Sequence, residues 1–255
     1  MNIFFGITNN ELKYRLTVPK FQNNSNPVKF FKLFSIKTNN NKWIINKVNC
    51  NQDNFFYYVD CDNIEHNSFF FLAQDDEINQ FKKSNFEKIL NLNEFTNTIP
   101  AFRSNLRIYN SFGGFSSYQS EYPYEMTLKN GSIITPLNTL SNINADYNKV
   151  FITNIFHKPI KEKFKIYFID INLKKILYNK EIYTNSLNEI EINKDFINPN
   201  VFLFTDKYLG VPVFVSCKNN HLSCEHTHPP HEYIISGDKY KKISELKKEM
   251  NEIIS

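Results

Sequence analysis

The sequence predicts a mostly β protein with an antiparallel, jelly-roll-like sandwich architecture and an α-helix at its C-terminus. Two observations carry this prediction. Aromatic residues make up 16% of the 255-residue chain, with 25 Phe and 14 Tyr, and both types favour strands. Short apolar runs of strand length recur along the chain, separated by Asn-rich turns. Two packed sandwich halves would account for the length.

Residues 1–100 are predicted to form a β-rich N-terminal domain with one helix. The strand-like runs cover 29–37, 42–48, 55–59 and 68–72. Asn-rich stretches at 23–27 and 38–41 indicate turns, because Asn tolerates left-handed backbone conformations. Apolar residues near helical spacing predict a helix from about 76 to 92.

Residues 101–237 are predicted to form a sandwich domain that carries the candidate sites. The strand-length runs cover 102–108, 149–155, 163–171, 175–178, 187–192, 201–204 and 211–217. No helical periodicity lies between the later runs, so a parallel α/β sheet is disfavoured. Alternation in KFKIYFID, which begins at Lys163, predicts one buried face and one wet face, with Tyr167 on the wet face. Asn130-Gly131 indicates a hairpin between residues 125 and 134.

Residues 238–255 are predicted to form a separate C-terminal helix. Its apolar residues recur at spacings of three and four with Lys and Glu between them, and they are Ile243, Leu246, Met250 and Ile253. We expect this helix to close the sandwich.

The composition argues against several classes of partner. The net charge is +4 and the lysines alternate with acids, whereas nucleic-acid binding needs a clustered basic face. No apolar stretch approaches the length of a membrane span, and the N-terminus lacks the pattern of a secretory signal. Four cysteines are too few for a disulfide scaffold. We therefore expect a cytoplasmic protein that binds neither nucleic acid nor membrane.

The first candidate site is a group of polar and aromatic residues within 102–126. The chain has only three arginines, and two of them share one face of the predicted strand 102–108. A guanidinium clamps carboxylates or phosphates, and tyrosine offers a stacking face for sugars. The predicted ligand-binding residues are Arg103, Asn105, Arg107, Tyr118, Gln119, Glu121 and Tyr122. The competing interpretation is that the arginines form surface ion pairs with Glu121 and Glu125.

The second candidate site is the segment HLSCEHTHPPHE at 221–232, which holds four of the six histidines. His226 and His228 lie two residues apart, so on a strand both would point the same way. With His231 and Glu232 they offer the imidazole and carboxylate ligands that Zn or Fe accepts. The competing interpretation is an ordered loop whose histidines cap backbone groups.

The spacing of His226, His228 and Glu232 resembles the metal-ligand portion of the first cupin motif, H-x-H-x3-E. The remainder of that pattern is absent. Asn220 stands in place of the leading glycine, and a predicted helix follows where a second motif is required. The sequence is therefore not assigned to that family. Cys224 adds a further ligand type for structural zinc.

These residues favour a ligand-binding protein with a polar, aromatic-lined pocket for a sugar or a small anionic metabolite. Two alternatives from other classes stay open. One is a metal-dependent hydrolase, isomerase or oxygenase that uses His226, His228 and Glu232. The other is a structural or assembly protein whose aromatic strands join the subunits of a homo-oligomer. No nucleophile elbow, phosphate-binding loop or dinucleotide fingerprint occurs in the sequence to decide between them.

Overall fold

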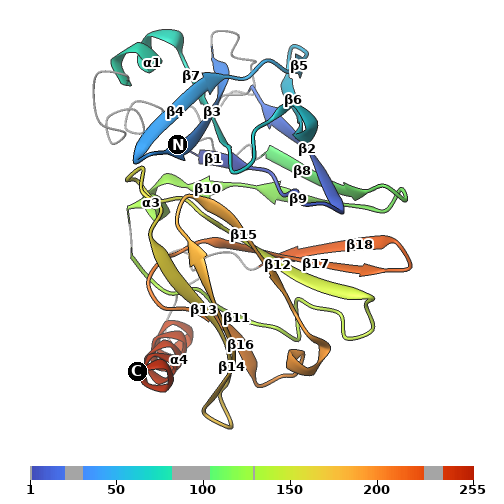
Figure 1. Ribbon diagram of the computed structural model, residues 1–255, viewed down its shortest axis with the longest axis vertical. Coiled ribbons are helices and arrows are strands. Elements are labelled where there is room, and N and C mark those ends of the chain that lie inside the picture. Colours follow the sequence, from blue (N-terminus) through green and yellow to red (C-terminus); the bar gives the residue numbers. More distant parts are fainter. Residues whose placement is uncertain (1, 21–30, 82–103, 129, 227–237) are drawn as a thin grey trace. The chain divides into compact units, whose positions relative to one another are not determined.

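The predicted fold class is confirmed. The described chain is mostly β, with four antiparallel sheets and a C-terminal helix in a sandwich-like architecture (Figure 1). The structure is a computed structural model that describes residues 2–20, 31–81, 104–128, 130–226 and 238–255.

The chain divides into two compact units. Unit 1 is Met1–Leu128 together with Ile155–Lys161, and unit 2 is Lys129–Asn154 together with Glu162–Ser255. These bounds differ from those of the predicted segments 1–100, 101–237 and 238–255, and the predicted boundary near residue 100 lies outside the described residues.

Unit 1 contains two five-stranded antiparallel sheets. Their strand orders are β10-β1-β7-β3-β4 and β5-β6-β2-β8-β9. The strands are β1 (Asn2–Phe5), β2 (Leu12–Pro19), β3 (Lys32–Asn39), β4 (Lys42–Lys47), β5 (Asn51–Gln52), β6 (Phe56–Asp60), β7 (Phe69–Ala73), β8 (Ser104–Asn110), β9 (Phe115–Ser120) and β10 (Tyr122–Pro123). The short helices are η1 (Cys61–Asn63), α1 (Asp75–Phe81) and α3 (Tyr124–Thr127).

Aromatic side chains fill the core of unit 1. All five residues of β7, FFFLA, are buried, so both faces of this strand are covered. Ser120 in β9 joins the two sheets, because its Oγ accepts from Phe5 N at 2.7 Å and donates to Phe5 O at 2.6 Å. Gly6 is required by close packing, since a Cβ at this position would lie 2.2–2.4 Å from the Tyr14 ring.

Unit 2 contains two four-stranded antiparallel sheets. Their strand orders are β11-β16-β13-β14 and β15-β12-β17-β18. The strands are β11 (Ile134–Pro136), β12 (Tyr147–Asn154), β13 (Lys163–Asp170), β14 (Lys175–Tyr183), β15 (Ser186–Glu191), β16 (Val201–Thr205), β17 (Val211–Lys218) and β18 (His221–His226). The helices are η3 (Lys194–Phe196) and α4 (Asp238–Ile254).

Helix α4 covers one face of the sheet β11-β16-β13-β14, which confirms the predicted C-terminal helix. Met250 is 0% exposed and packs in one cluster with Tyr167, Ile169 and Phe204. Consequently the prediction of a wet face along KFKIYFID is wrong beyond Lys165. Tyr167 is buried on that face, because α4 shields it from solvent.

Asparagine pairs form two of the tight turns. Asn40 and Asn41, with φ of 49° and 56°, link β3 to β4, and Asn219 and Asn220, with φ of 49° and 65°, link β17 to β18. Two consecutive positive φ angles are typical of the type I′ turn, whose twist matches that of the flanking strands. The predicted turn at 38–41 is therefore confirmed.

Each predicted strand overlaps a strand of the structure, but β1, β2, β5, β9, β10, β11 and β18 were not predicted. The start of the predicted helix 76–92 is confirmed by α1, and the residues after 81 lie outside the described chain. The predicted hairpin at Asn130-Gly131 is wrong. Asn130 bridges to Tyr208 and Gly131 N donates to Lys207 O at 2.9 Å, so this segment pairs with a distant loop instead of with its neighbours.

Candidate functional site

The sheet β5-β6-β2-β8-β9 of unit 1 has one buried face and one exposed face. Even-numbered side chains of β2 and β8 are buried, apart from the half-buried Asn110, and odd-numbered ones are exposed or half-buried, apart from the buried Pro19. We call the second face the exposed sheet face. Its side chains are Tyr58 and Asp60 of β6, Lys13, Arg15 and Thr17 of β2, Asn105, Arg107 and Tyr109 of β8, and Phe115, Ser117 and Gln119 of β9.

The strand register arranges these side chains in rows across the sheet. The central row runs from Asp60 through Arg15 and Arg107 to Ser117. Two arginines are therefore direct cross-strand neighbours, a placement that is destabilising when like charges face each other without partners.

The two guanidinium groups take partners on opposite sides. Arg15 bonds to Asp60 on β6, with Nε 2.7 Å from Oδ1 and Nη2 3.2 Å from Oδ2, and this carboxylate raises the pKa of Arg15. Arg107 instead lies over the ring of Phe115 on β9, with Cζ 4.1 Å from the ring centroid. The repulsion between the neighbours is thereby relieved, and Arg107 takes the aromatic partner.

The cations of the exposed sheet face differ in how they are neutralised. Lys13 Nζ donates to Asp62 Oδ1 at 2.8 Å, and this contact raises the pKa of Lys13. Arg15 is paired with Asp60. Among the residues that the structure describes, Arg107 forms no ion pair and contacts the aromatic ring of Phe115. Of the three cations Lys13, Arg15 and Arg107 described on this face, Arg107 is the one whose charge has no acidic partner among the described residues.

The hairpin between β8 and β9 carries a second exposed phenylalanine, Phe112, besides Phe115. Asn110 Oδ1 accepts from the backbone N–H groups of Phe112 and Gly114, at 3.1 and 2.9 Å, and Gly113 adopts a φ of 87° that favours glycine. The tight turn leaves Phe112 75% and Phe115 55% exposed. Both phenylalanine side chains of the hairpin therefore face solvent.

The structure brings together some of the residues predicted for the first site. Asn105, Arg107 and Gln119 are exposed on the same face, and Asn105 and Gln119 are cross-strand neighbours. Tyr118 and Tyr122 lie in the core instead, 8% and 0% exposed, and burial raises the pKa of Tyr122. Glu121 is half-buried between β9 and β10. Arg103 lies outside the described residues.

Sequence reasoning missed the residues that β2 and β6 contribute to this face, and Phe115 of β9. Lys13, Arg15, Asp60 and Phe115 were not considered. The signal for the first two was present, because LKYRLTVP alternates apolar and polar residues at the period of a strand. The adjacency of Arg15 and Arg107 carries no sequence signal, since it depends on the pairing of β2 with β8.

The histidine-rich segment begins as a strand. His221–His226 forms β18 at the edge of its sheet, where Leu222, Cys224 and His226 are half-buried. His228, His231 and Glu232 lie outside the described residues. Within the described chain, no group of three or more His, Cys, Asp or Glu side chains is placed to hold a metal ion. The metal site at His226, His228, His231 and Glu232 stays a prediction.

Comparisons with known proteins identify no relative, so any functional assignment has to be argued from the residues of this chain. No protein-family model, no curated protein and no solved structure matches the chain. In the part of the chain that is described, none of the helices combines the length and the apolar character needed to cross a membrane.

Proposed function

We propose that the protein is a ligand-binding protein that recognises an anionic carbohydrate on the exposed sheet face of unit 1. The observation that carries the proposal is Arg107, which stacks on Phe115 at 4.1 Å and has no acidic partner among the described residues. A guanidinium has five N–H donors, and a ring accepts none of them as a strong hydrogen bond, so the contact with Phe115 leaves donors for carboxylate or sulfate oxygens.

Stacking also lowers the cost of binding. A free arginine loses side-chain entropy when it fixes a ligand, whereas the ring of Phe115 already restricts Arg107. The interaction between a cation and an aromatic ring is worth about 0.5–1 kcal/mol at an exposed site. This is enough to favour one conformation without preventing the contact with an anion.

The neighbours of Arg107 suit sugar hydroxyl groups. Asn105 and Gln119 present amides that both donate and accept, and Ser117 lies directly across from Arg107. Phe112, together with the part of the Phe115 ring that Arg107 leaves exposed, offers apolar surface on which a sugar ring can stack. Together these residues supply one cation that can bind an anion, several neutral hydrogen-bonding groups and an aromatic surface.

The geometry favours a chain of sugars over a single small molecule. The residues follow the strands of a sheet over several rows, so the surface is extended and not enclosed. An extended ligand can contact the amide row and the arginine row at once, and several weak contacts would then add up.

Calorimetric titration with a panel of oligosaccharides tests the proposal. Each member carries carboxylate or sulfate groups and is measured beside its neutral counterpart. We expect binding of an acidic member, at least tenfold weaker binding to Arg107→Gln, and weaker binding to Phe115→Leu. Lys165→Gln is the matched control, because it removes an exposed cation from unit 2. Equal affinity for acidic and neutral members, or for Arg107→Gln and the native chain, would overturn it.

A further inference from the structure

The chain passes between the two units three times, after Leu128, after Asn154 and after Lys161. At each passage, described residues of unit 2 at or next to the boundary make specific contacts within unit 2. These contacts can be followed entirely within unit 2. They converge on three consecutive residues of the connection between β16 and β17, namely Lys207, Tyr208 and Leu209.

The first passage enters unit 2 at its earliest described residues, Asn130 and Gly131. Asn130 forms an antiparallel bridge with Tyr208, and Gly131 N donates to Lys207 O at 2.9 Å. Gly131 also packs tightly on Leu209, since a Cβ there would lie 2.9 Å from the leucine side chain. Glycine is scarce in this chain, and here it allows a close approach to that connection.

The second passage leaves unit 2 at Asn154, the last residue of β12. Its Nδ2 donates to Leu209 O at 2.5 Å, and its Oδ1 accepts from Asn185 N at 3.2 Å. Gly210 follows Leu209 and again permits close packing, because a Cβ there would lie 2.8 Å from Thr153 O.

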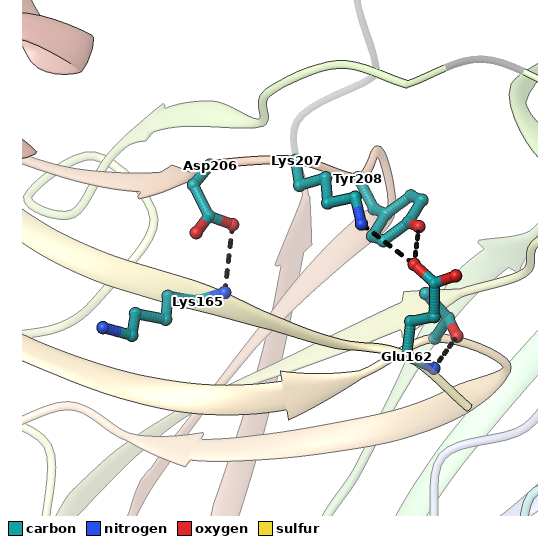
Figure 2. Close-up of polar contacts among 6 residues, drawn as sticks. Glu162, Lys165, Asp206, Lys207 and Tyr208 are labelled. Carbon is teal, nitrogen blue, oxygen red and sulfur yellow. Dashed lines mark hydrogen bonds and ion pairs between the residues drawn. The ribbon is translucent and has the colours of Figure 1, made fainter. Parts of the chain in front are cut away.

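The third passage returns at Glu162, whose carboxylate is bound by two consecutive residues of this connection (Figure 2). One oxygen, Oε2, accepts from Lys207 Nζ at 2.9 Å and from the hydroxyl of Tyr208. The backbone is fixed as well, since Glu162 N donates to Thr184 Oγ1 at 2.8 Å and Thr184 N donates to Glu162 O at 3.0 Å. Glu162 therefore cannot move without breaking four contacts.

The connection itself is held to the sheet beneath it. Thr205 Oγ1 donates to Tyr208 O at 3.1 Å, and the ring of Tyr208 meets the ring of Phe164 edge-on at 5.3 Å. Asp206 pairs with the backbone of Lys165, with Lys165 N donating to Asp206 Oδ1 at 3.0 Å (Figure 2). These contacts restrict the conformation of the loop relative to the sheet.

We infer that residues 206–210 are the common anchor of all three chain passages of unit 2, so that loosening one passage loosens the others. The segment between the second and third passages, Ile155–Lys161, is in turn bound within unit 1, where His157 N donates to Thr127 O at 3.1 Å. A change in the conformation of residues 206–210 should therefore alter the unit 2 ends of all three segments that join it to unit 1.

Amide hydrogen exchange followed by NMR in the Tyr208→Phe variant tests this inference. The change removes one hydroxyl that contacts Glu162 and keeps the ring that packs on Phe164. We expect exchange about tenfold faster, equivalent to about 1.4 kcal/mol, at the amides of Glu162, Thr184 and Gly131 together. The response of Gly131 is decisive, because its amide bonds to Lys207 O and lies on a different passage.

Two further variants complete the experiment. Lys207→Met removes the other side-chain contact of Glu162 at a half-exposed position and should give the same joint response. Tyr183→Phe is the matched control, an exposed tyrosine of β14, and should leave all three amides unchanged. Faster exchange at Glu162 alone would overturn the inference, as would an equal response in the control variant or a uniform rise over β12 and β17.

Discussion

Replacing Met250 with Ala tests how α4 is attached to unit 2. Met250 is 0% exposed and packs against Tyr167, Ile169 and Phe204. Removing a buried Met side chain costs about 2–5 kcal/mol, from lost apolar transfer and from the cavity that remains. The other apolar residues of α4 at this contact, Leu246, Ile253 and Ile254, are only partly buried and can close in on the gap. We therefore expect a loss near the lower end, about 2–3 kcal/mol.

Urea denaturation with two probes measures this loss and locates it. Trp43, in β4, is the single Trp of the chain, so its fluorescence reports on unit 1. Amide exchange in β13 and β16 reports on the sheet under α4. We expect Met250→Ala to lower the stability reported by amide exchange in β13 and β16, and to change the Trp43 unfolding curve little. Glu245→Ala, an exposed change in the same helix, serves as control.

A loss below about 0.5 kcal/mol, the usual range of a surface substitution, would refute the packing argument. An equal shift of the Trp43 signal would contradict the assignment of the contact to unit 2 alone.

Two further predictions concern the core of unit 1 and the charge under α4. Gly6→Ala should cost about 1–3 kcal/mol of stability in urea denaturation, because the added Cβ would overlap the Tyr14 ring; an unchanged midpoint would contradict that overlap. Burial lowers the pKa of Lys247, whose Nζ donates to Ser132 O at 2.6 Å. Between that lowered pKa and the ordinary value of 10.5, the unfolded chain holds a proton that the folded chain has released, so stability should rise with pH in that window. Lys247→Met should flatten this slope in denaturation measured below pH 10, before tyrosines ionise; a slope that persists in the variant would assign it to other groups.

Periodicity was the reliable part of the sequence signal. The apolar spacing around Leu246 and Met250 predicted a helix over 238–255, and α4 spans Asp238–Ile254. The Asn-rich stretch at 38–41 predicted a turn, because its residues accept positive φ, and Asn40 and Asn41 adopt it. Both features depend on local conformation, which neighbouring residues decide.

Features that depend on packing between distant segments were beyond sequence reasoning. The alternation of residues predicts that Tyr167 is exposed to solvent, whereas packing against α4 buries it. Asn130-Gly131 has the strongest local turn signal, yet its backbone bonds to the connection after β16. Local propensity was overridden there by a tertiary contact.

The candidate site was predicted in part for the same reason. Asn105 and Arg107 were correctly assigned to one face of a strand, because period-2 spacing determines which side chains share a face. Whether Tyr118 faces a ligand or the core depends on which side of β9 packs inward, and it is the core. The stacking partner of Arg107 is Phe115, which only the register of β8 with β9 identifies.

The most direct test of the proposed function is an NMR titration of labelled protein with the acidic oligosaccharide that binds most tightly in calorimetry. We predict that the largest amide shifts fall on Asn105, Arg107, Ser117 and Gln119, which lie together on the exposed sheet face. The shifts should disappear in Arg107→Gln at the same ligand concentration. Shifts confined to unit 2, or shifts on this face that survive Arg107→Gln, would contradict the proposal.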